Sequence, residues 1–144
     1  MTLFPTGRRI FFLQEIGEPE ANVLRVVVAE ASAQENATTV PGTDFIARPV
    51  IPVTNEQSWQ LTWDSYIAYA VRNESYWQSD NRPDCDDRLL VRSQSAFLDF
   101  VGASTFASDD FPGKYSHWEL ICADHVIDVV STSGPYIERR LTRA

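Results

Sequence analysis

The chain has 144 residues, 44% of them hydrophobic, which suffices for one domain with a sizeable core and leaves little room for a second. Its 20 acidic and 12 basic side chains give a net charge of −8, which disfavours binding to nucleic acid or anionic membranes and favours a basic partner. No apolar run approaches the ~20 residues that span a bilayer, and the N-terminal segment lacks the long apolar stretch of a signal peptide, so we expect a cytoplasmic protein.

The beginning of the chain predicts an antiparallel hairpin. Residues 9–16 and 22–31 are rich in β-branched and aromatic side chains, and the Gly-Glu-Pro-Glu stretch at 17–20 is typical of a turn. Alternation along the first strand places Ile16 on the face opposite to Phe11. The second strand is apolar on both faces, so we expect it to be central and covered on both sides.

The segments around this hairpin are less regular. Residues 32–43 are polar and end in Pro-Gly, which indicates a loop. Residues 44–53 contain Pro49 and Pro52, and since proline cannot donate to a sheet ladder, we expect extended chain or an edge strand there. Residues 78–88 are the most polar stretch of the sequence and are predicted to form another loop.

The clearest strand signal lies at residues 58–64, where two tryptophans and a leucine alternate with polar side chains. A second apolar strand is predicted at 66–76. The Asp64-Ser65 pair between them either forms a tight turn or lies within one long bent strand, and the sequence leaves both possibilities open.

Residues 93–103 are the one good helix candidate. Ser93 or Ser95 can accept a hydrogen bond from a free backbone N–H of the first turn. Apolar residues then recur at helical spacing, and Phe97 and Phe100 are expected on the apolar face.

Short strands are expected before and after this helix. They lie at residues 89–91, 115–123, 126–130 and 136–141. In the second of them, Trp118, Leu120 and Cys122 are expected to point inward, while His117 and Glu119 share the other face.

This order of elements predicts an α+β fold with antiparallel neighbours rather than alternating βαβ units. We expect a curved, mainly antiparallel sheet of about six to seven strands, which could form a partial barrel, with the helix near residues 93–103 against one face. Residues 1–144 are predicted to form a single domain.

The sequence lacks the common cofactor and metal patterns. Its six glycines form no phosphate-binding loop, and neither His-Glu-x-x-His nor paired Cys-x-x-Cys occurs, so we expect no cofactor and no metal. The loop at 78–88 holds four aspartates, but the calcium pattern needs a central glycine and a distal glutamate, so we interpret them as a solvated acidic loop. They are Asp80, Asp84, Asp86 and Asp87.

The nearest approach to a catalytic set is Cys122 with His125 or His117, and Glu74 with His117 is a second acid/base pair. A neighbouring imidazole can promote the thiolate that cysteine chemistry needs. However, the five-residue spacing of His117 and Cys122 places them on opposite faces of a regular strand. We therefore favour a structural cysteine and two surface or capping histidines.

A polar patch at the end of the 66–76 strand mixes charge, amide and aromatic groups that could hold a ligand or a partner. The candidate binding residues are Tyr69, Arg72, Asn73, Glu74, Tyr76 and His117. The same side chains could instead pair across strands and fix the register, which is the interpretation we prefer.

Three classes of function follow. The first and preferred one is a non-catalytic acidic protein that binds a basic protein, for example an immunity-type inhibitor of a bacterial toxin. The second is a small-ligand binding domain with an aromatic-lined pocket. That pocket would be lined by Trp59, Trp63, Tyr69 and Trp118. The third is a small enzyme that depends on cysteine and histidine.

Overall fold

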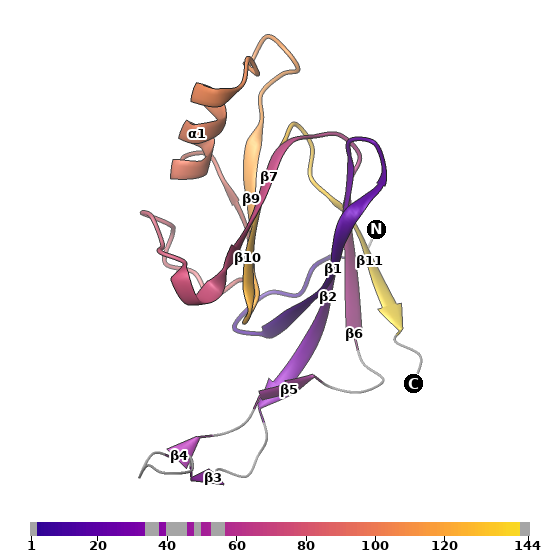
Figure 1. Ribbon diagram of the computed structural model, residues 1–144, viewed down its shortest axis with the longest axis vertical. Coiled ribbons are helices and arrows are strands. Elements are labelled where there is room, and N and C mark those ends of the chain that lie inside the picture. The colour runs from indigo at the N-terminus through magenta and orange to yellow at the C-terminus, as the bar shows by residue number, and fades with distance from the viewer. Residues whose placement is uncertain (1–2, 34–37, 40–45, 48–49, 53–56, 142–144) are drawn as a thin grey trace.

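The computed structural model describes residues 3–33, 38–39, 46–47, 50–52 and 57–141. Its main strands form two antiparallel sheets (Figure 1). The first sheet runs in the order β1 (Ile10–Glu20), β2 (Val23–Ala33), β6 (Gln57–Trp63) and β11 (Tyr136–Leu141), with β5 (Val50–Pro52) paired to the end of β2. The second runs in the order β7 (Tyr66–Asn73), β10 (His125–Ser131), β9 (Ser116–Ile121) and β8 (Leu89–Arg92).

The remaining elements are small. Strands β3 (Thr38–Thr39) and β4 (Ile46–Ala47) pair with each other. The described residues contain one 3₁₀ turn, η1 (Glu74–Tyr76), and one α-helix, α1 (Ala96–Ser104). The prediction of a mainly antiparallel α+β fold with one helix is confirmed. The strands are divided between two sheets rather than joined in one, and neither sheet closes on itself. Most of the predicted loop at 32–43 and part of the 44–53 segment lie outside the described residues.

The predicted hairpin of β1 and β2 is present, but its turn lies later than the sequence indicates. β1 continues through Gly17 and Pro19 to Glu20, and Asn22 takes the positive φ of 67° that the turn requires. Asparagine tolerates this left-handed conformation better than most residues. Its backbone N–H also donates to Oε1 of Glu18 at 3.0 Å, which holds the turn closed.

A register shift between Leu13 and Glu15 corrects the predicted facing of β1. The extra residue turns Ile16 to the same side as Phe11 and Leu13, and all three contact the core. At the shift, the backbone N–H of Leu13 donates to Oδ1 of Asp124 at 3.1 Å. The bulge thus links β1 to the turn between β9 and β10.

The chain crosses from one sheet to the other at two points that lie close together. β6 continues into β7 through Asp64-Ser65, and β10 continues into β11, so β6 pairs with β11 in one sheet and β7 with β10 in the other. The Asp64-Ser65 pair is therefore a bend between sheets and not a hairpin turn. The buried Ser131 hydroxyl donates to the carbonyl of Ser65 at 3.1 Å and ties the two crossings together.

The hydrophobic core lies between the two sheets. Trp59, Leu61 and Trp63 enter it from β6, as their alternation predicts, and Trp118 and Leu120 enter from β9. Strand β2 contributes Leu24, Val26 and Val28, each with no exposed surface, and its other face is also buried at Val27 and Ala29. A strand covered on both faces is what its continuous apolar sequence predicts.

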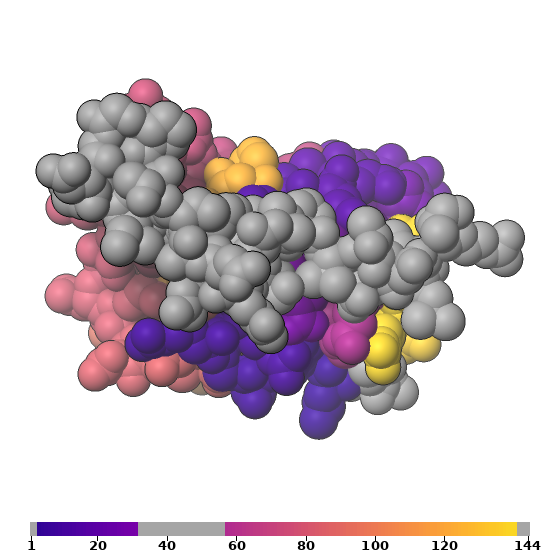
Figure 2. Space-filling model, turned by 90° about the horizontal axis from the view of Figure 1, so that it is seen from below, coloured from indigo at the N-terminus to yellow at the C-terminus, as the bar shows by residue number. Residues whose placement is uncertain are grey.

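The helix α1 lies on the opposite side of the second sheet from this core, and the loop after η1 lies beside it (Figure 1). Seen from below, the residues that follow β7 form one side of the molecule and β11 the other (Figure 2).

Ser95 caps the helix α1, with its Oγ accepting the N–H of Leu98 at 3.0 Å. Val101 is fully buried, whereas Phe100 is 59% exposed and does not join the covered face as its spacing predicts. Neither α1 nor η1, the helices of the described chain, has the length and apolar character to cross a membrane.

Candidate functional site

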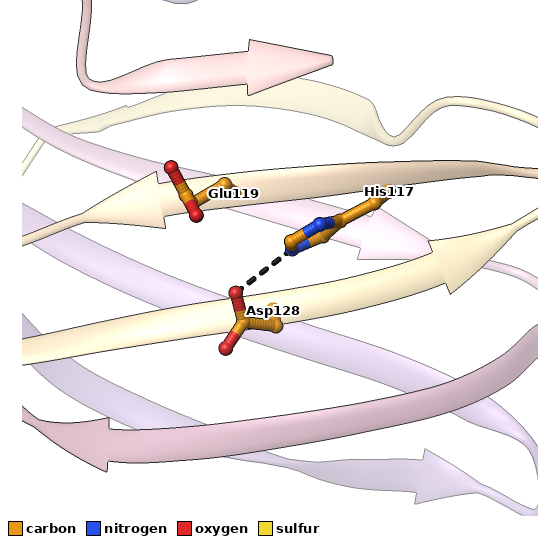
Figure 3. Close-up of side chains that lie close together, drawn as sticks. All are labelled: His117, Glu119 and Asp128. Atoms are coloured by element: carbon orange, nitrogen blue, oxygen red, sulfur yellow. Dashed lines mark hydrogen bonds and ion pairs between the residues drawn. The ribbon is translucent and has the colours of Figure 1, made fainter. Parts of the chain in front are cut away.

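The outer face of the second sheet carries a cluster of buried ionisable side chains. His117 and Glu119 lie on β9 and Asp128 lies on β10, and Figure 3 shows their side chains turned toward one another. Each is at most 1% exposed. The prediction that His117 shares a face with Glu119 is confirmed, but this face is covered by α1 and the 77–88 loop, so His117 is not a surface residue.

His117 connects the sheet to the beginning of the helix. Its Nε2 lies 2.8 Å from Oδ1 of Asp128, and its Nδ1 lies 2.7 Å from Oγ of Ser95. An ionised carboxylate can only accept, so the proton belongs on Nε2. In the neutral ring, Nδ1 then accepts the Ser95 hydroxyl proton, and the helix cap is fixed to the sheet.

Asp128 is also held by an arginine from the neighbouring strand. Arg72 on β7 donates from Nε to Oδ2 at 3.1 Å and from Nη2 to Oδ1 at 3.0 Å. A two-point contact of this kind orients the guanidinium as well as neutralising the carboxylate. The Arg72 side chain is 42% exposed, so its outer edge reaches the surface while Asp128 stays buried.

A second arginine neutralises the other half of the cluster. Nη1 of Arg92 lies 2.8 Å from Oδ1 of Asp80 and 3.2 Å from Oε2 of Glu119. The hydrogen bond from Arg92 holds the pKa of Asp80 below its usual value against the opposing effect of burial. Burial would lower the pKa of Arg92, but its bond to Asp80 and the charges of Glu119 and Asp80 outweigh burial and raise it. Arg82 lies in the 77–88 loop, as Asp80 does, and its Nε is 3.1 Å from Oε1 of Glu119.

The cluster has the residue types of a metal site, but its electrostatics fit an ion-pair network better. Potential ligand atoms of His117, Glu119 and Asp128 lie within 4.8 Å of one another. Nevertheless, Nε2 of His117 faces Asp128 as a donor, whereas a metal needs its free lone pair. Glu119, Asp128 and Asp80 are already matched by three guanidinium groups, so a dication would have to displace them.

Ser95, His117 and Asp128 form the hydroxyl–imidazole–carboxylate chain of hydrogen bonds that a hydrolytic triad has. However, the Ser95 hydroxyl already both donates and accepts a hydrogen bond within the protein. Its Oγ accepts from Leu98 in addition to its contact with His117. The N–H of Ala96, which could otherwise stabilise an oxyanion, donates to Oδ2 of Asp80 at 2.7 Å. Ser95 therefore acts as a helix cap that is tied to the sheet.

The structure brings together only some of the sequence-predicted candidates. Arg72 and His117 meet at Asp128, as described above. Asn73 caps η1, with its Oδ1 accepting the N–H of Ser75 at 2.9 Å, and Tyr76 is 86% exposed. Tyr69 lies on the core side of β7 and packs edge-on against Tyr66.

Glu74 and Cys122 share a different, small hollow of about 170 Å³, which Arg9 and Arg88 also line. Cys122 is 2% exposed and packs in the core, so it lies on the opposite face of β9 from His117, as the alternation predicts. Burial raises the pKa of its thiol, which favours the unreactive protonated form. The ring of His125 lies beside Asp124, with Nδ1 3.1 Å from Oδ2.

The aspartates of the 78–88 loop are not all solvated. Asp80 pairs with Arg92, and Oδ1 of Asp87 accepts the N–H of Gly7 at 2.6 Å, while Asp84 and Asp86 are exposed. Asp128, Ser95 and the arginines Arg82 and Arg92 were not predicted as site residues. Asp128 has a visible signal, because it is the one charged residue inside the apolar run from Val126 to Val130. The contacts of Arg82 and Arg92 with Glu119 join residues 37 and 27 positions apart, and the sequence does not display them.

Trp59, Trp63 and Trp118, from which an aromatic-lined pocket is predicted, belong to the buried hydrophobic core between the sheets. Comparison with protein families, with curated proteins and with solved structures finds no match to this chain. The function has to be inferred from the surfaces and clefts around α1.

Proposed function

We propose that this chain is a non-catalytic protein that binds a basic protein partner, as an immunity-type inhibitor binds a toxin. The proposed contact surface, which we call the acidic-aromatic end, consists of the last turns of α1 and residues 105–115. The observation that carries the proposal is the combination of exposed phenylalanines and exposed carboxylates in this one segment.

The aromatic part of this end is unusually open to solvent. Phe100 is 59% exposed, Phe111 is 65% exposed and Phe106 is 86% exposed. The rings of Phe106 and Phe111 are nearly parallel, at 16°, with their centroids 6.4 Å apart. Grouped exposed aromatics of this size mark interaction sites, because their burial contributes much of the energy of protein interfaces.

The negative charge of the same end favours a partner that carries positive charge. Asp109 and Asp110 of this end are exposed, as is Asp99 in the first turn of α1, and Lys114 is the one basic residue between 93 and 115. Asp99, Asp109 and Lys114 line an open cleft of about 490 Å³ between α1 and the segment that follows it. The cleft has room for a lysine or arginine side chain from the partner, and complementary charge would speed the encounter.

The experiment compares capture by the wild-type chain with capture by two surface variants. One bait is immobilised as the wild type, one as Phe106→Ser with Phe111→Ser, and one as Asp109→Asn with Asp110→Asn. Control baits carry Tyr136→Ser, which removes an exposed aromatic from β11, or Asp84→Asn with Asp86→Asn, which removes the same charge from another loop. Each bait is exposed at low salt to lysate of the organism that encodes the chain.

The expected result is a basic protein that both control baits retain and both test baits lose. Its association rate should fall steeply as salt is raised, since the steering is electrostatic. The proposal fails if the test baits capture the same proteins as the wild type, if the captured partner is acidic, or if no protein distinguishes test from control baits.

A further inference from the structure

We propose that a second site on this chain, which shares Phe100 with the acidic-aromatic end, binds a small organic acid. The site is a cleft of about 250 Å³ on the outer face of the second sheet, between β7 and α1, which we call the Arg72 cleft. The carboxylate of the ligand would bind the outer edge of Arg72, and its apolar body would lie against Phe97 and Phe100. The inference does not depend on the acidic-aromatic end.

The shape of the cleft comes from small residues beside large ones. Ala70 on β7 and Ala96 at the start of α1 line it, and neither has a side chain that could fill it. Phe97 and Phe100 form an apolar wall, with ring centroids 6.0 Å apart and planes at 18°. The volume is slightly below the range of about 300–1,000 Å³ for drug-sized ligands, so a small flat molecule fits best.

The polar floor of the cleft decides the charge of the ligand. Asp128 and Asp80 both line it, but their oxygens are already bonded, the first by Arg72 and His117 and the second by Arg92 and Ala96. A ligand cation would have to displace an arginine that is held by two hydrogen bonds. The carboxylate oxygens of the cleft are thus bonded from within the protein.

The donors of the cleft are not satisfied in the same way. Arg72 uses Nε and Nη2 for Asp128, and its Nη1 makes no hydrogen bond to any residue that the structure describes. The exposed Gln78 lies at the same cleft and offers an amide N–H₂ as a second donor. Free donors on a positively charged group match a carboxylate, which accepts hydrogen bonds through both oxygens.

Arg72 is positioned for this role before a ligand arrives. Asp128 fixes the guanidinium from below, His117 fixes Asp128, and Ser95 fixes His117. The negative charges of Asp80 and Asp128 are each compensated by an arginine, so they oppose an incoming anion only weakly. A pre-oriented cation loses little conformational entropy on binding, which favours affinity for a small ligand.

Three probes of similar size, each a phenyl ring with one polar head group, test the charge of the site. Benzoate, benzamide and benzylamine are each titrated into the ¹⁵N-labelled chain, and backbone amide shifts are followed. Benzoate should bind saturably, with the largest shifts at Ala70, Arg72 and Phe97, and benzamide should bind about 10-fold more weakly because it lacks the charge. Benzylamine should not bind there.

Variants test the location. Arg72→Gln should weaken benzoate binding by about 10- to 100-fold, while Arg25→Gln, which removes the same charge from β2, should not change it. Ala70→Leu fills the cleft and should abolish binding, whereas Ala68→Leu, on the same face of β7 but outside the cleft, should not. If Ala70→Leu does not fold, as judged by its amide spectrum, Ala70→Val takes its place.

The inference is overturned if no probe shifts these amides, if benzamide or benzylamine binds as well as benzoate, or if the filled cleft still binds it. The capture experiment changes Phe106, Phe111, Asp109 and Asp110, none of which lines the Arg72 cleft, so the two proposals fail separately.

Discussion

The two faces of β9 and β10 are buried to the same degree and carry opposite chemistry. Trp118 and Leu120 turn toward the core between the sheets, and Ile127 and Val129 join them from β10. The other face holds His117, Glu119 and Asp128, with the buried Val126 and Val130 on either side of Asp128, under the cover of α1 and the 77–88 loop.

The difference lies in what each face requires of its cover. Apolar packing has no direction and tolerates changes of shape that conserve volume. An ion-pair network has direction, and each member that loses its partner leaves a buried charge or donor unsatisfied. We therefore expect the outer face to be the less tolerant of the two, although both are covered.

The largest effect is expected from Asp128→Ala. The change leaves Nε2 of His117 without its acceptor and Arg72 without its two-point contact. Loss of one partner of a buried pair costs about 3–5 kcal/mol of unfolding free energy, and we expect the lower end because Arg72 is partly exposed.

Urea unfolding measures this loss, with Asp86→Ala as the control. Asp86 pairs with Arg8 at the exposed surface, so its removal should change stability by less than about 1 kcal/mol. A loss below about 1 kcal/mol for Asp128→Ala as well would mean that the outer face tolerates disruption.

The next test makes changes of similar shape on adjacent residues. Glu119→Gln keeps the volume but removes the charge that faces Arg92 and Arg82, and should cost about 2–3 kcal/mol. Leu120→Met, on the core face, should cost less than about 1.5 kcal/mol. Equal losses in thermal or urea unfolding would remove the distinction between the two faces.

The sequence predicts the individual strands better than their arrangement. The alternation of Trp59, Leu61 and Trp63 is a local property and correctly identifies both the strand and its buried face. Whether Asp64-Ser65 is a turn or a bend depends on which strands β6 and β7 pair with. β6 pairs with β2 and β11, and β7 pairs with β10, and each of these pairings joins residues at least 29 positions apart. A division into two sheets is therefore not visible in any local pattern.

The candidate site is predictable to a similar extent. Alternation places His117 and Glu119 on one face, but the burial of that face depends on a helix and a loop distant in the sequence. The predicted face of Ile16 is wrong for a related reason. One extra residue in β1 moves the side chains that follow it to the opposite face of the sheet. Patterns of period two hold only as long as the ladder stays regular.

A smaller effect is expected at the helix cap, where the sequence offers Ser93 and Ser95 equally. Ser95→Ala removes the acceptor for the N–H of Leu98 and the contact with His117, and should cost about 1–2 kcal/mol. Ser93→Ala removes neither and should leave stability within about 0.5 kcal/mol of the wild type. Hydrogen exchange of the amides in α1 would report the same difference, and equal exchange in both variants would contradict the assigned cap.

The smallest effect concerns the pH dependence of stability at Asp80. Its pKa is lowered from 3.8 in the folded state, mainly by the hydrogen bond from Arg92. The folded state therefore holds fewer protons than the unfolded state just below pH 3.8. The contribution of this group to stability is complete above pH 3.8 and is lost as pH falls through the lowered pKa. Because Asp80 is 38% exposed, solvent screens the interaction and the effect is modest.

Urea midpoints from pH 2 to 7 should fall less steeply in acid for Asp80→Asn than for the wild type. Asp84→Asn, which changes an exposed residue of the same loop, should follow the wild type. Parallel curves for all three chains would show that the charge of Asp80 does not contribute to stability, and that the loop is held to Arg92 by the backbone carbonyl of Asp80 instead.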